Sequence, residues 1–473
     1  MPVRPDLSLR EPRNITQHGW LARIALIVLL LLPSLELVNS VRAQQTPDAP
    51  AASSLTTSAP AAKSDRAKQA TASPSPEPET IWNREALTLG DTRKNWEEHG
   101  VKFELSWTNF FQGVASGGLE TGFAYGGKFT GVLTLDTTKL GWWKNGQFQV
   151  KVDNRYHDSA SELTGSLFPV NTGLVAPKET GTATAVTAFN YTHIFPLFQP
   201  GDMVPVSLGR FDTLDLVVEP LIGGSGINKF MNVNQVAPPH EGRNVPLVTW
   251  GSTVAWVRKG EPFFTVAFLD SADSSTTTGL RNLFGKGVTM MPAIILPTHF
   301  GGKAGHQGIR ASWSNQTVTP FDQVRALVLP SPNRPVQRKS GSWSVTYSFD
   351  QYFHELPGFP RKGWGLFGQA GFADRRTNPI QTFINIGVGG NSPFKKRPRD
   401  LFGVAYSFNS ISGDFKDALS PVARFRNAHE FEAFYNLALT PWMYFSPDLQ
   451  LVRPSRPRVD LAVVPGARLK IVF

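Results

Sequence analysis

The last nine residues of the chain, 465–473, alternate between polar and apolar side chains and stop on an aromatic ring. Successive side chains of a strand point to opposite faces. Two sets result: Ala467, Leu469, Ile471 and Phe473 on one face, and Gly466, Arg468, Lys470 and Val472 on the other. An apolar strand face at the end of a chain promotes aggregation in water. The pattern favours a sheet that closes on itself and turns this face to lipid; an edge strand of a secreted β-protein is the alternative.

The first 43 residues have the layout of a signal peptide. Arg10, Arg13 and Arg23 precede an apolar run at 24–32, and Val41-Arg-Ala43 offers small residues for cleavage after Ala43. Pro33 and Glu36 interrupt the apolar run well before the roughly 20 residues that a membrane-spanning helix needs. Since no later run is long and apolar enough, a membrane-integral mature chain has to be a β-barrel.

The composition divides the remainder of the chain into three parts. Residues 44–80 are rich in Ala, Pro, Ser, Thr and Gln, which predicts a disordered linker. Residues 81–100 carry a short helical pattern with Trp96 as an apolar contact, which predicts a helical lead-in. From residue 101 to 473 the pattern changes to a period of two, and we assign this whole segment to the barrel.

The clearest predicted hairpin spans residues 128–155. Its second strand alternates Phe148, Val150 and Val152 with polar residues. Trp142 and Trp143 stand beside the turn, where a membrane barrel places its interfacial aromatic girdle, whereas a soluble sandwich would bury them. Similar alternation recurs at 250–256, 264–268, 343–349, 402–408 and 433–439.

Long and short connections alternate along the chain. Long stretches rich in Gly, Pro, Ser and Thr lie near 157–185, 213–245 and 270–288, whereas 259–262 and 440–442 are brief. Outer-membrane barrels have short turns on the periplasmic side and long loops outside. We therefore predict an all-β fold, a transmembrane antiparallel barrel of about 16 strands. A barrel of that size would enclose a water-filled lumen.

Composition excludes several classes of function. The chain has no cysteine, so it has no disulfide and no thiolate chemistry. Its 47 Lys and Arg against 37 Asp and Glu give a net charge of +10, but the basic residues are scattered, which argues against nucleic-acid binding. The nine His residues share no nucleophile or metal-ligand motif, and no Gly-x-Ser-x-Gly is present. We expect neither an enzyme nor a bound cofactor.

Strand parity also selects candidate residues for the inner wall. A diffusion pore needs a polar, charged constriction that binds its solute weakly. The candidates are Lys151, Asp153, Arg155, Glu430, Glu432, Asp448, Gln450, Arg468 and Lys470. Asp153 with Arg155, and Glu432 with Asp448 and Gln450 on adjacent strands, are the predicted eyelet groups. The alternative is that they are ordinary lumen charges far from the narrowest point.

Several runs resemble those of one family. They lie at 208–215, 228–232, 284–288, 296–298, 300–306, 372–375, 432–435, 440–442 and 447–450. Together they resemble the carbohydrate-selective porin (OprB) family over about residues 96–473, and the terminal Phe473 resembles the assembly signal of bacterial outer-membrane barrels. The long Ala/Pro leader and the basic segment 395–399 depart from the family pattern.

The resemblance implies a 16-stranded outer-membrane barrel that passes glucose-like sugars through a narrowed eyelet. Arg210, Asp212 and Asp215 match the family stretch, but strand parity breaks there and leaves their direction open. The expected partners are small carbohydrates, outer-membrane lipid and the barrel assembly machinery; the choice between a monomer and a homotrimer stays open. The positive balance keeps open a porin for anionic solutes such as sugar acids, and a soluble carbohydrate-binding β-domain is the last alternative.

Overall fold

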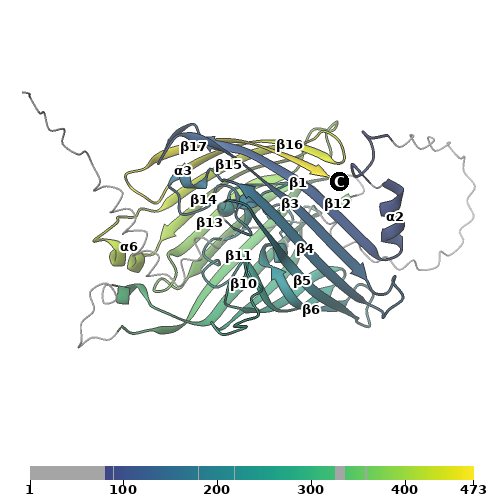
Figure 1. Cartoon of the computed structure of the whole chain (residues 1–473), viewed down its shortest axis with the longest axis horizontal. Coiled ribbons are helices and arrows are strands. Elements are labelled where there is room, and N and C mark those ends of the chain that lie inside the picture. The colour runs from purple at the N-terminus through teal and green to yellow at the C-terminus, as the bar shows by residue number, and fades with distance from the viewer. Residues whose placement is uncertain (1–79, 89, 179–180, 218, 325–335, 357–358) are drawn as a thin grey trace, which may run out of the picture.

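The computed structural model describes residues 80–473 except 89, 179–180, 218, 325–335 and 357–358. The chain forms one closed antiparallel barrel (Figure 1). Its strands are β1 (Val101–Val114), β2 (Ser116–Gly118), β3 (Gly122–Asp136), β4 (Gly146–His157), β5 (Ala183–Pro196), β6 (Met203–Asp212), β7 (Val248–Arg258), β8 (Glu261–Asp270), β9 (Val288–Phe300), β10 (Lys303–Val318), β11 (Lys339–Leu356), β12 (Phe359–Ala373), β13 (Ile380–Asn391), β14 (Leu401–Ile411), β15 (Ala428–Ala438), β16 (Met443–Arg453) and β17 (Asp460–Val472). The short β2 pairs only with β17, so 16 strands build the wall, as predicted.

The C-terminal strand closes the barrel. Strand β17 pairs with β1, with Trp107 opposite Ile471 and Phe110 opposite Arg468. Every other wall strand pairs with its neighbours in sequence, so the wall has no free edge. The predicted transmembrane antiparallel barrel is confirmed.

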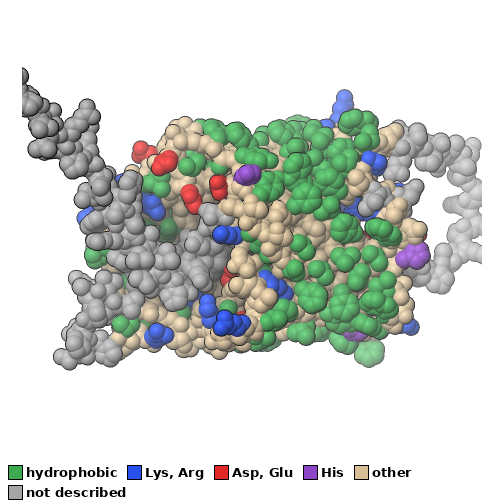
Figure 2. All heavy atoms as spheres, viewed as in Figure 1, with side chains coloured by type: hydrophobic (Ala, Val, Ile, Leu, Met, Phe, Trp, Pro, Cys, Tyr) green, Lys and Arg blue, Asp and Glu red, His purple; other side chains and the backbone are tan. Residues whose placement is uncertain are grey.

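The outer wall is apolar and the inner wall polar, as the alternation predicted. Large exposed apolar side chains include Phe111, Trp142, Trp143, Trp256, Ile294, Trp313, Trp343, Ile384 and Val404. Figure 2 shows hydrophobic side chains over much of the wall on the face in view. Because such a surface is unfavourable in water, it fits a barrel surrounded by lipid.

Connections differ in length at the two ends of the barrel. Two-residue turns join β7 to β8 and β9 to β10. Lys259 and Gly260 have φ of 52° and 83°, and Gly301 and Gly302 have 58° and 73°, as the tightest hairpin turns require. The connections after β4, β6 and β8 are the long ones that the sequence predicted.

Two of the long connections fold into the barrel. We call residues 213–247 the inward loop and residues 158–182 the β4–β5 loop. The inward loop contains η2 (Thr213–Leu216) and α4 (Val233–Val236), and the β4–β5 loop contains α3 (Ser161–Thr164) and η1 (Thr172–Leu174). The remaining short helices are η3 (Phe321–Gln323) and α6 (Gly413–Leu419).

The inward loop packs against the wall and fills part of the lumen. Its Leu221, Ile222, Phe230 and Val236 form a buried cluster with wall residues that include Phe367 and Phe434. Phe230 is fully buried and contacts the ring of Phe434 edge-on, with 4.9 Å between centroids. A barrel of this size was expected to be water-filled; here a polypeptide segment with its own apolar side chains occupies part of that space.

The lead-in to the barrel lies at the end that carries the C-terminus (Figure 1). Its helix α2 spans Gly90–Glu98. Arg93 Nη1 donates to the Phe473 carboxyl-terminal oxygen (3.0 Å), the Leu87 N–H to Val472 O (3.0 Å), and Trp442 Nε1 to Ile81 O (2.6 Å). The lead-in thus contacts the strands that close the barrel.

The predicted signal peptide at 1–43 and all but the last residue of the predicted linker at 44–80 lie outside the described residues and stay predictions. Within the described part of the chain, every helix is too short or too polar to cross a membrane.

Substituting Arg93→Ala should lower the temperature at which the barrel loses its compact gel mobility. The variant removes one bond to the end of β17, which is worth about 1 kcal/mol, and leaves the strand pairing intact. The measurement is gel mobility after stepwise heating in detergent, with Lys395→Ala in an exposed turn as control. A transition temperature equal to that of the control would show that the lead-in adds no stability.

Candidate functional site

Strand β4 carries three of the predicted lumen residues, and all three are buried on the inner wall: Lys151, Asp153 and Arg155. Val152 between them is 38% exposed on the outer wall. Asp153 accepts hydrogen bonds from the hydroxyls of Thr130 (2.7 Å) and Thr187 (2.5 Å), and the Lys128 ammonium lies 3.4 Å from its carboxylate. Strand parity therefore predicted their inward direction correctly.

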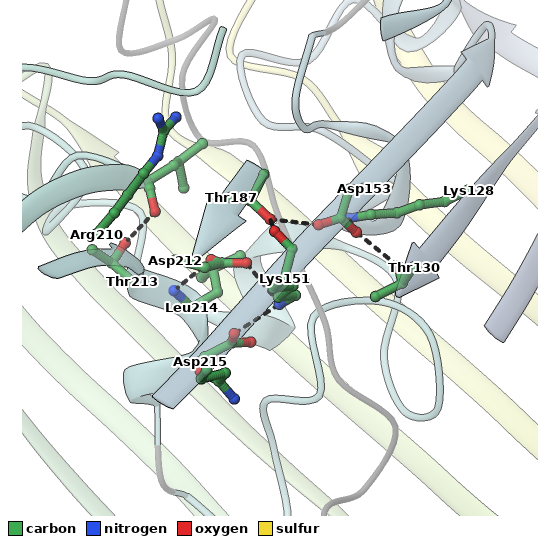
Figure 3. A network of polar contacts seen from close by, with 12 residues as sticks. Lys128, Thr130, Lys151, Asp153, Thr187, Arg210, Asp212, Thr213, Leu214 and Asp215 are labelled. Carbon is green, nitrogen blue, oxygen red and sulfur yellow. Dashed lines mark hydrogen bonds and ion pairs between the residues drawn. The ribbon is translucent and has the colours of Figure 1, made fainter. Parts of the chain in front are cut away.

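Lys151 binds two carboxylates that the sequence left unassigned (Figure 3). Its ammonium lies 3.0 Å from Asp212 Oδ2 and 2.7 Å from Asp215 Oδ2. Asp215 lies in η2 at the start of the inward loop, and its side chain is 23% exposed. Enclosure raises the pKa of the Asp215 carboxyl, while the Lys151 ammonium opposes the shift. Two carboxylates thus share one ammonium at the wall.

A hollow of about 240 Å³ opens beside this pair of carboxylates. It is lined by Gln149, Ala188, Asn190, Ser207, Phe211, Asp212, Asp215, Leu216 and Thr253. The polar members offer hydroxyl, amide and carboxylate groups, and Phe211 and Leu216 add apolar surface. Such a mixture suits a small solute that has both hydroxyl groups and C–H faces.

Buried arginines of the wall bind the carbonyl groups of loops. Arg155 donates to Leu174 O (2.9 Å) and Gly181 O (2.7 Å) in the β4–β5 loop. Arg210, whose direction the sequence left open, donates to Ser274 O (2.5 Å) and Thr277 O (2.8 Å) in the connection after β8. Neither arginine faces the hollow, so Arg155 serves as a loop attachment.

The predicted acidic residues of β15 bind the inward loop. Glu432 accepts hydrogen bonds from the backbone N–H groups of Met231 (2.5 Å) and Asn232 (2.9 Å). Glu430 accepts from the side-chain amides of Asn232 (2.7 Å) and Asn234 (2.6 Å). Both glutamates are buried: Glu432 has 0% and Glu430 has 1% of its surface exposed.

Strands β16 and β17 attach the same loop. Gln450 lies opposite Glu432 in the register and accepts from Asn232 Nδ2 (3.0 Å), while Asp448 accepts from Gln450 Nε2 (3.0 Å). Arg468 donates to Gly226 O (2.5 Å) and Lys229 O (2.9 Å). Lys470 donates to Asn228 Oδ1 (2.8 Å). The sequence predicted that Glu432, Asp448 and Gln450 lie together on adjacent strands, and they do; Glu432 and Gln450 bind the inward loop, and their place in an eyelet stays a prediction.

The other side of the lumen holds a charged group that sequence analysis missed. Arg310 of β10 donates through Nε to both oxygens of Glu241 (3.0 Å each) and through Nη1 to Glu219 (3.4 Å). Gln369 of β12 donates to the same Glu219 oxygen (3.4 Å). Arg310, Glu219 and Glu241 remain partly exposed, with 16%, 13% and 11% of their side-chain surface accessible.

His240 attaches the inward loop to β11. Its Nε2 lies 2.9 Å from the Thr346 hydroxyl, which itself donates to Glu241. Because that hydroxyl has one hydrogen, Nε2 of His240 must carry the proton of the bond. Burial lowers the pKa of His240 to about 4; Glu241 opposes the shift and Arg310 adds to it. The imidazole is therefore neutral at pH 7.

The two inward segments also meet each other. The Thr172 N–H donates to Met231 O (2.7 Å) and the Val233 N–H to Pro169 O (3.1 Å). The β4–β5 loop and the inward loop are therefore joined to each other inside the barrel. Among the residues that the structure describes, no group of three or more His, Cys, Asp or Glu is placed to hold a metal ion.

A closed barrel with an apolar outer wall and loops folded into its lumen defines an outer-membrane porin. A family model described as "Carbohydrate-selective porin, OprB family" matches residues 120–473, and the chain belongs to this family. The resemblance seen in the sequence is thereby confirmed. Family and fold together place the protein in the bacterial outer membrane and point to a channel.

The curated relatives match over a limited segment. Porin B of Pseudomonas aeruginosa is 24% identical over 152 residues, which is 28% of this chain and 33% of that protein. Porin AaxA of Chlamydia trachomatis serovar L2 is 26% identical over 152 residues, covering 31% of this chain and 30% of that protein. The chain thus matches about a third of the length of these relatives.

Solved structures share the fold along the whole barrel. The high-pH structure of Pseudomonas putida OprB has a TM-score of 0.70 at 19% identity, covering 84% of this chain and 100% of that chain. The low-pH structure of the same protein has a TM-score of 0.51 at 17% identity, covering 83% and 99%. At these identities the likeness establishes the architecture.

Substituting Glu432→Ala should release the inward loop and raise the single-channel conductance. The variant leaves the N–H groups of Met231 and Asn232 without their acceptor, at a cost of about 1–3 kcal/mol for each buried group. Conductance in planar bilayers is the measurement, and Asp417→Asn in the exposed part of α6 is the control. Equal conductance of the two variants would show that Glu432 does not hold the constriction.

The contribution of His240 to docking of the inward loop should weaken as the pH falls from about 6.5 to 4. When the loop is undocked, His240 takes up a proton near its ordinary pKa of 6.5. When the loop is docked, burial lowers the pKa of His240 to about 4. The stabilisation is therefore complete above pH 6.5 and is lost across this window.

Hydrogen exchange of residues 231–244, measured from pH 7 to 4, tests this expectation after correction for intrinsic exchange rates. His240→Gln keeps a donor toward Thr346 but cannot be protonated, so its protection should change less with pH. The same pH profile in both proteins would exclude His240 as the responsible group.

Proposed function

We propose that the protein lets small carbohydrates diffuse passively into the periplasm through the passage that the inward loop narrows. The observation that carries this proposal is the hollow beside Lys151, Asp212 and Asp215, in a lumen narrowed by two loops. Family membership supports sugars as the solute class. Transport follows the concentration gradient, without a cofactor or energy coupling.

A sugar in this hollow can exchange water for protein partners one hydroxyl at a time. Asn190, Gln149 and Asp215 provide donors and acceptors at its edge, and Phe211 provides a face for C–H groups. Because Lys151 is bound to both carboxylates, their negative charge is partly balanced where the solute would bind. Binding is then weak enough for the solute to leave on the far side.

Anionic solutes such as sugar acids find less support. Lys151 is engaged by Asp212 and Asp215, and the guanidinium groups of Arg155 and Arg468 are directed to loop carbonyls. The hollow itself is lined by two carboxylates and no basic side chain among the described residues. An anion would have to approach those carboxylates without a free cation to offset the repulsion.

The remaining partners belong to the same proposal. Lipid surrounds the apolar outer wall, the assembly machinery recognises the strand that ends at Phe473, and three copies can associate through part of the wall. Exposed Trp142 and Trp143 beside the turn after β3 support an interfacial position at the membrane surface.

The function is tested by conductance in planar bilayers with glucose added. The native protein should show discrete steps that glucose blocks in a saturable way. Substituting Asp215→Asn should raise the glucose concentration for half-block about tenfold, since a hydrogen bond to a charged group is worth about 1.5–3 kcal/mol.

Asp460→Asn, at an exposed strand end, is the matched control and should leave the block unchanged. If Asp215→Asn also leaves it unchanged, the hollow is not the sugar site. If folded native protein gives no steps, the proposal of a diffusion pore fails.

A further inference from the structure

Many of the basic side chains that the structure describes are exposed in connections and at strand ends. Examples are Lys144, Lys259, Arg281, Lys286, Arg361, Lys362, Arg375, Arg376, Lys395, Lys396, Arg399, Arg424, Arg453, Arg456 and Arg458. Such charges are screened over about 8–10 Å at physiological salt. The groups at the constriction therefore dominate what a solute experiences there.

Two of the charged clusters at the constriction hold two carboxylates for one cation. On the β4 side, Asp212 and Asp215 share Lys151. On the β10 side, Glu219 and Glu241 share Arg310. When all groups are ionised, each cluster retains one negative charge.

The cluster on the β10 side also has acceptors without donors. Glu219 Oε2 and Gln369 Oε1 are buried and have no hydrogen-bond partner among the described residues. Gln369 is only 3% exposed, and its amide nitrogen points to Glu219. A buried acceptor without a donor costs free energy, so this site is suited to a solute group that supplies hydrogen atoms.

One stretch of the inward loop carries a carboxylate of each cluster. Four steps of chain separate Asp215 from Glu219, so their Cα atoms lie at most about 14 Å apart. Asp215 reaches Lys151 on one wall, and Glu219 reaches Arg310 on another. A solute that passes this stretch of the loop meets both clusters in turn.

Two basic residues of the loop have to be set against this surplus: Arg243, which donates to Thr377 O (3.2 Å) and Gln316 Oε1 (3.0 Å), and Lys229. Lys229 is partly exposed and donates to Pro220 O (2.8 Å) and Ile222 O (3.3 Å), which directs its ammonium to the backbone of its own loop. Its charge offsets part of the negative surplus but does not supply a donor to Glu219 Oε2 or Gln369 Oε1.

We infer that the constriction prefers a polar solute with an ammonium group, of the size of a hexosamine, over the neutral sugar of the same size. This inference rests on the proposed sugar passage. It specifies which class of solute best fits the charge of that passage. An ammonium group has three donors and no acceptor, which complements the unpartnered oxygens of Glu219 and Gln369. Its positive charge is attracted to both clusters, whereas a carboxylate is repelled.

The preference is measured with glucosamine, glucose and gluconate, which share a carbon skeleton and differ in charge. At pH 7 and 0.1 M KCl, glucosamine should block single-channel current at a several-fold lower concentration than glucose, and gluconate at a higher one. Raising KCl to 1 M should bring the blocking concentrations of glucosamine and glucose closer together, because the electrostatic screening length falls to about 3 Å.

Two variants separate charge from hydrogen bonding. Glu219→Gln removes the charge and keeps the shape, and Gln369→Leu removes the unpartnered acceptor without changing the charge. Both should reduce the ratio of glucose to glucosamine blocking concentrations, whereas Asp417→Asn in α6 should not. An unchanged ratio in both variants would overturn the assignment of this cluster.

The outcomes distinguish this inference from the proposed function. Block by glucose without any preference for glucosamine would overturn the inference and leave the sugar passage standing. A reversal potential that shows potassium selectivity without that preference would reduce the site to an inorganic cation site and also overturn it. Steps that no sugar blocks would end both proposals.

Discussion

The fold of the pore depends on which wall residues form hydrogen bonds with the backbone of the inward loop inside the barrel. A segment without regular structure exposes N–H and C=O groups that need partners when they are buried. Here the inner wall supplies them: Glu432 accepts from N–H groups at Met231 and Asn232, and Arg468 donates to carbonyls at Gly226 and Lys229. The charged residues of the wall are therefore loop partners first.

This use of charge determines which groups remain for a solute. Arginines directed to carbonyls and glutamates directed to N–H groups are shielded from the passage. Two clusters that contain partly exposed carboxylates join the inward loop to the wall, around Lys151 and Arg310, and in each of them two carboxylates share one cation. The electrostatic character of the constriction thus follows from a few groups and differs from that of the chain as a whole.

Alternation in the sequence was sufficient to predict the barrel and the faces of its strands. Lys151, Asp153, Glu432 and Arg468 all have the inward direction that parity assigned to them, because a strand leaves a side chain only two directions. Parity does not reveal what lies opposite an inward side chain. Residues that bind a loop and residues that border a channel have the same pattern, so parity alone cannot distinguish an eyelet group from a loop partner.

The charged residues around Arg310 were not predicted, because most of them lie where the sequence has no regular pattern. Glu219, Glu241 and His240 lie in a loop where no period applies, and their positions depend on contacts with β10, β11 and β12 far along the chain. Arg310 follows the inward parity of β10, as do Ser312 and Ser314, which are buried. Its parity in β10 is as clear as that of Lys151 in β4, so its inward direction was predictable from the sequence.

The contacts of the lead-in join the two ends of the described chain. Leu87 and Arg93 donate to backbone oxygens of Val472 and Phe473, at the end of the strand that pairs with both β16 and β1. The segment that precedes the first wall strand is thus held by the last one, and a change at either end of the described chain acts on the same seam of the barrel.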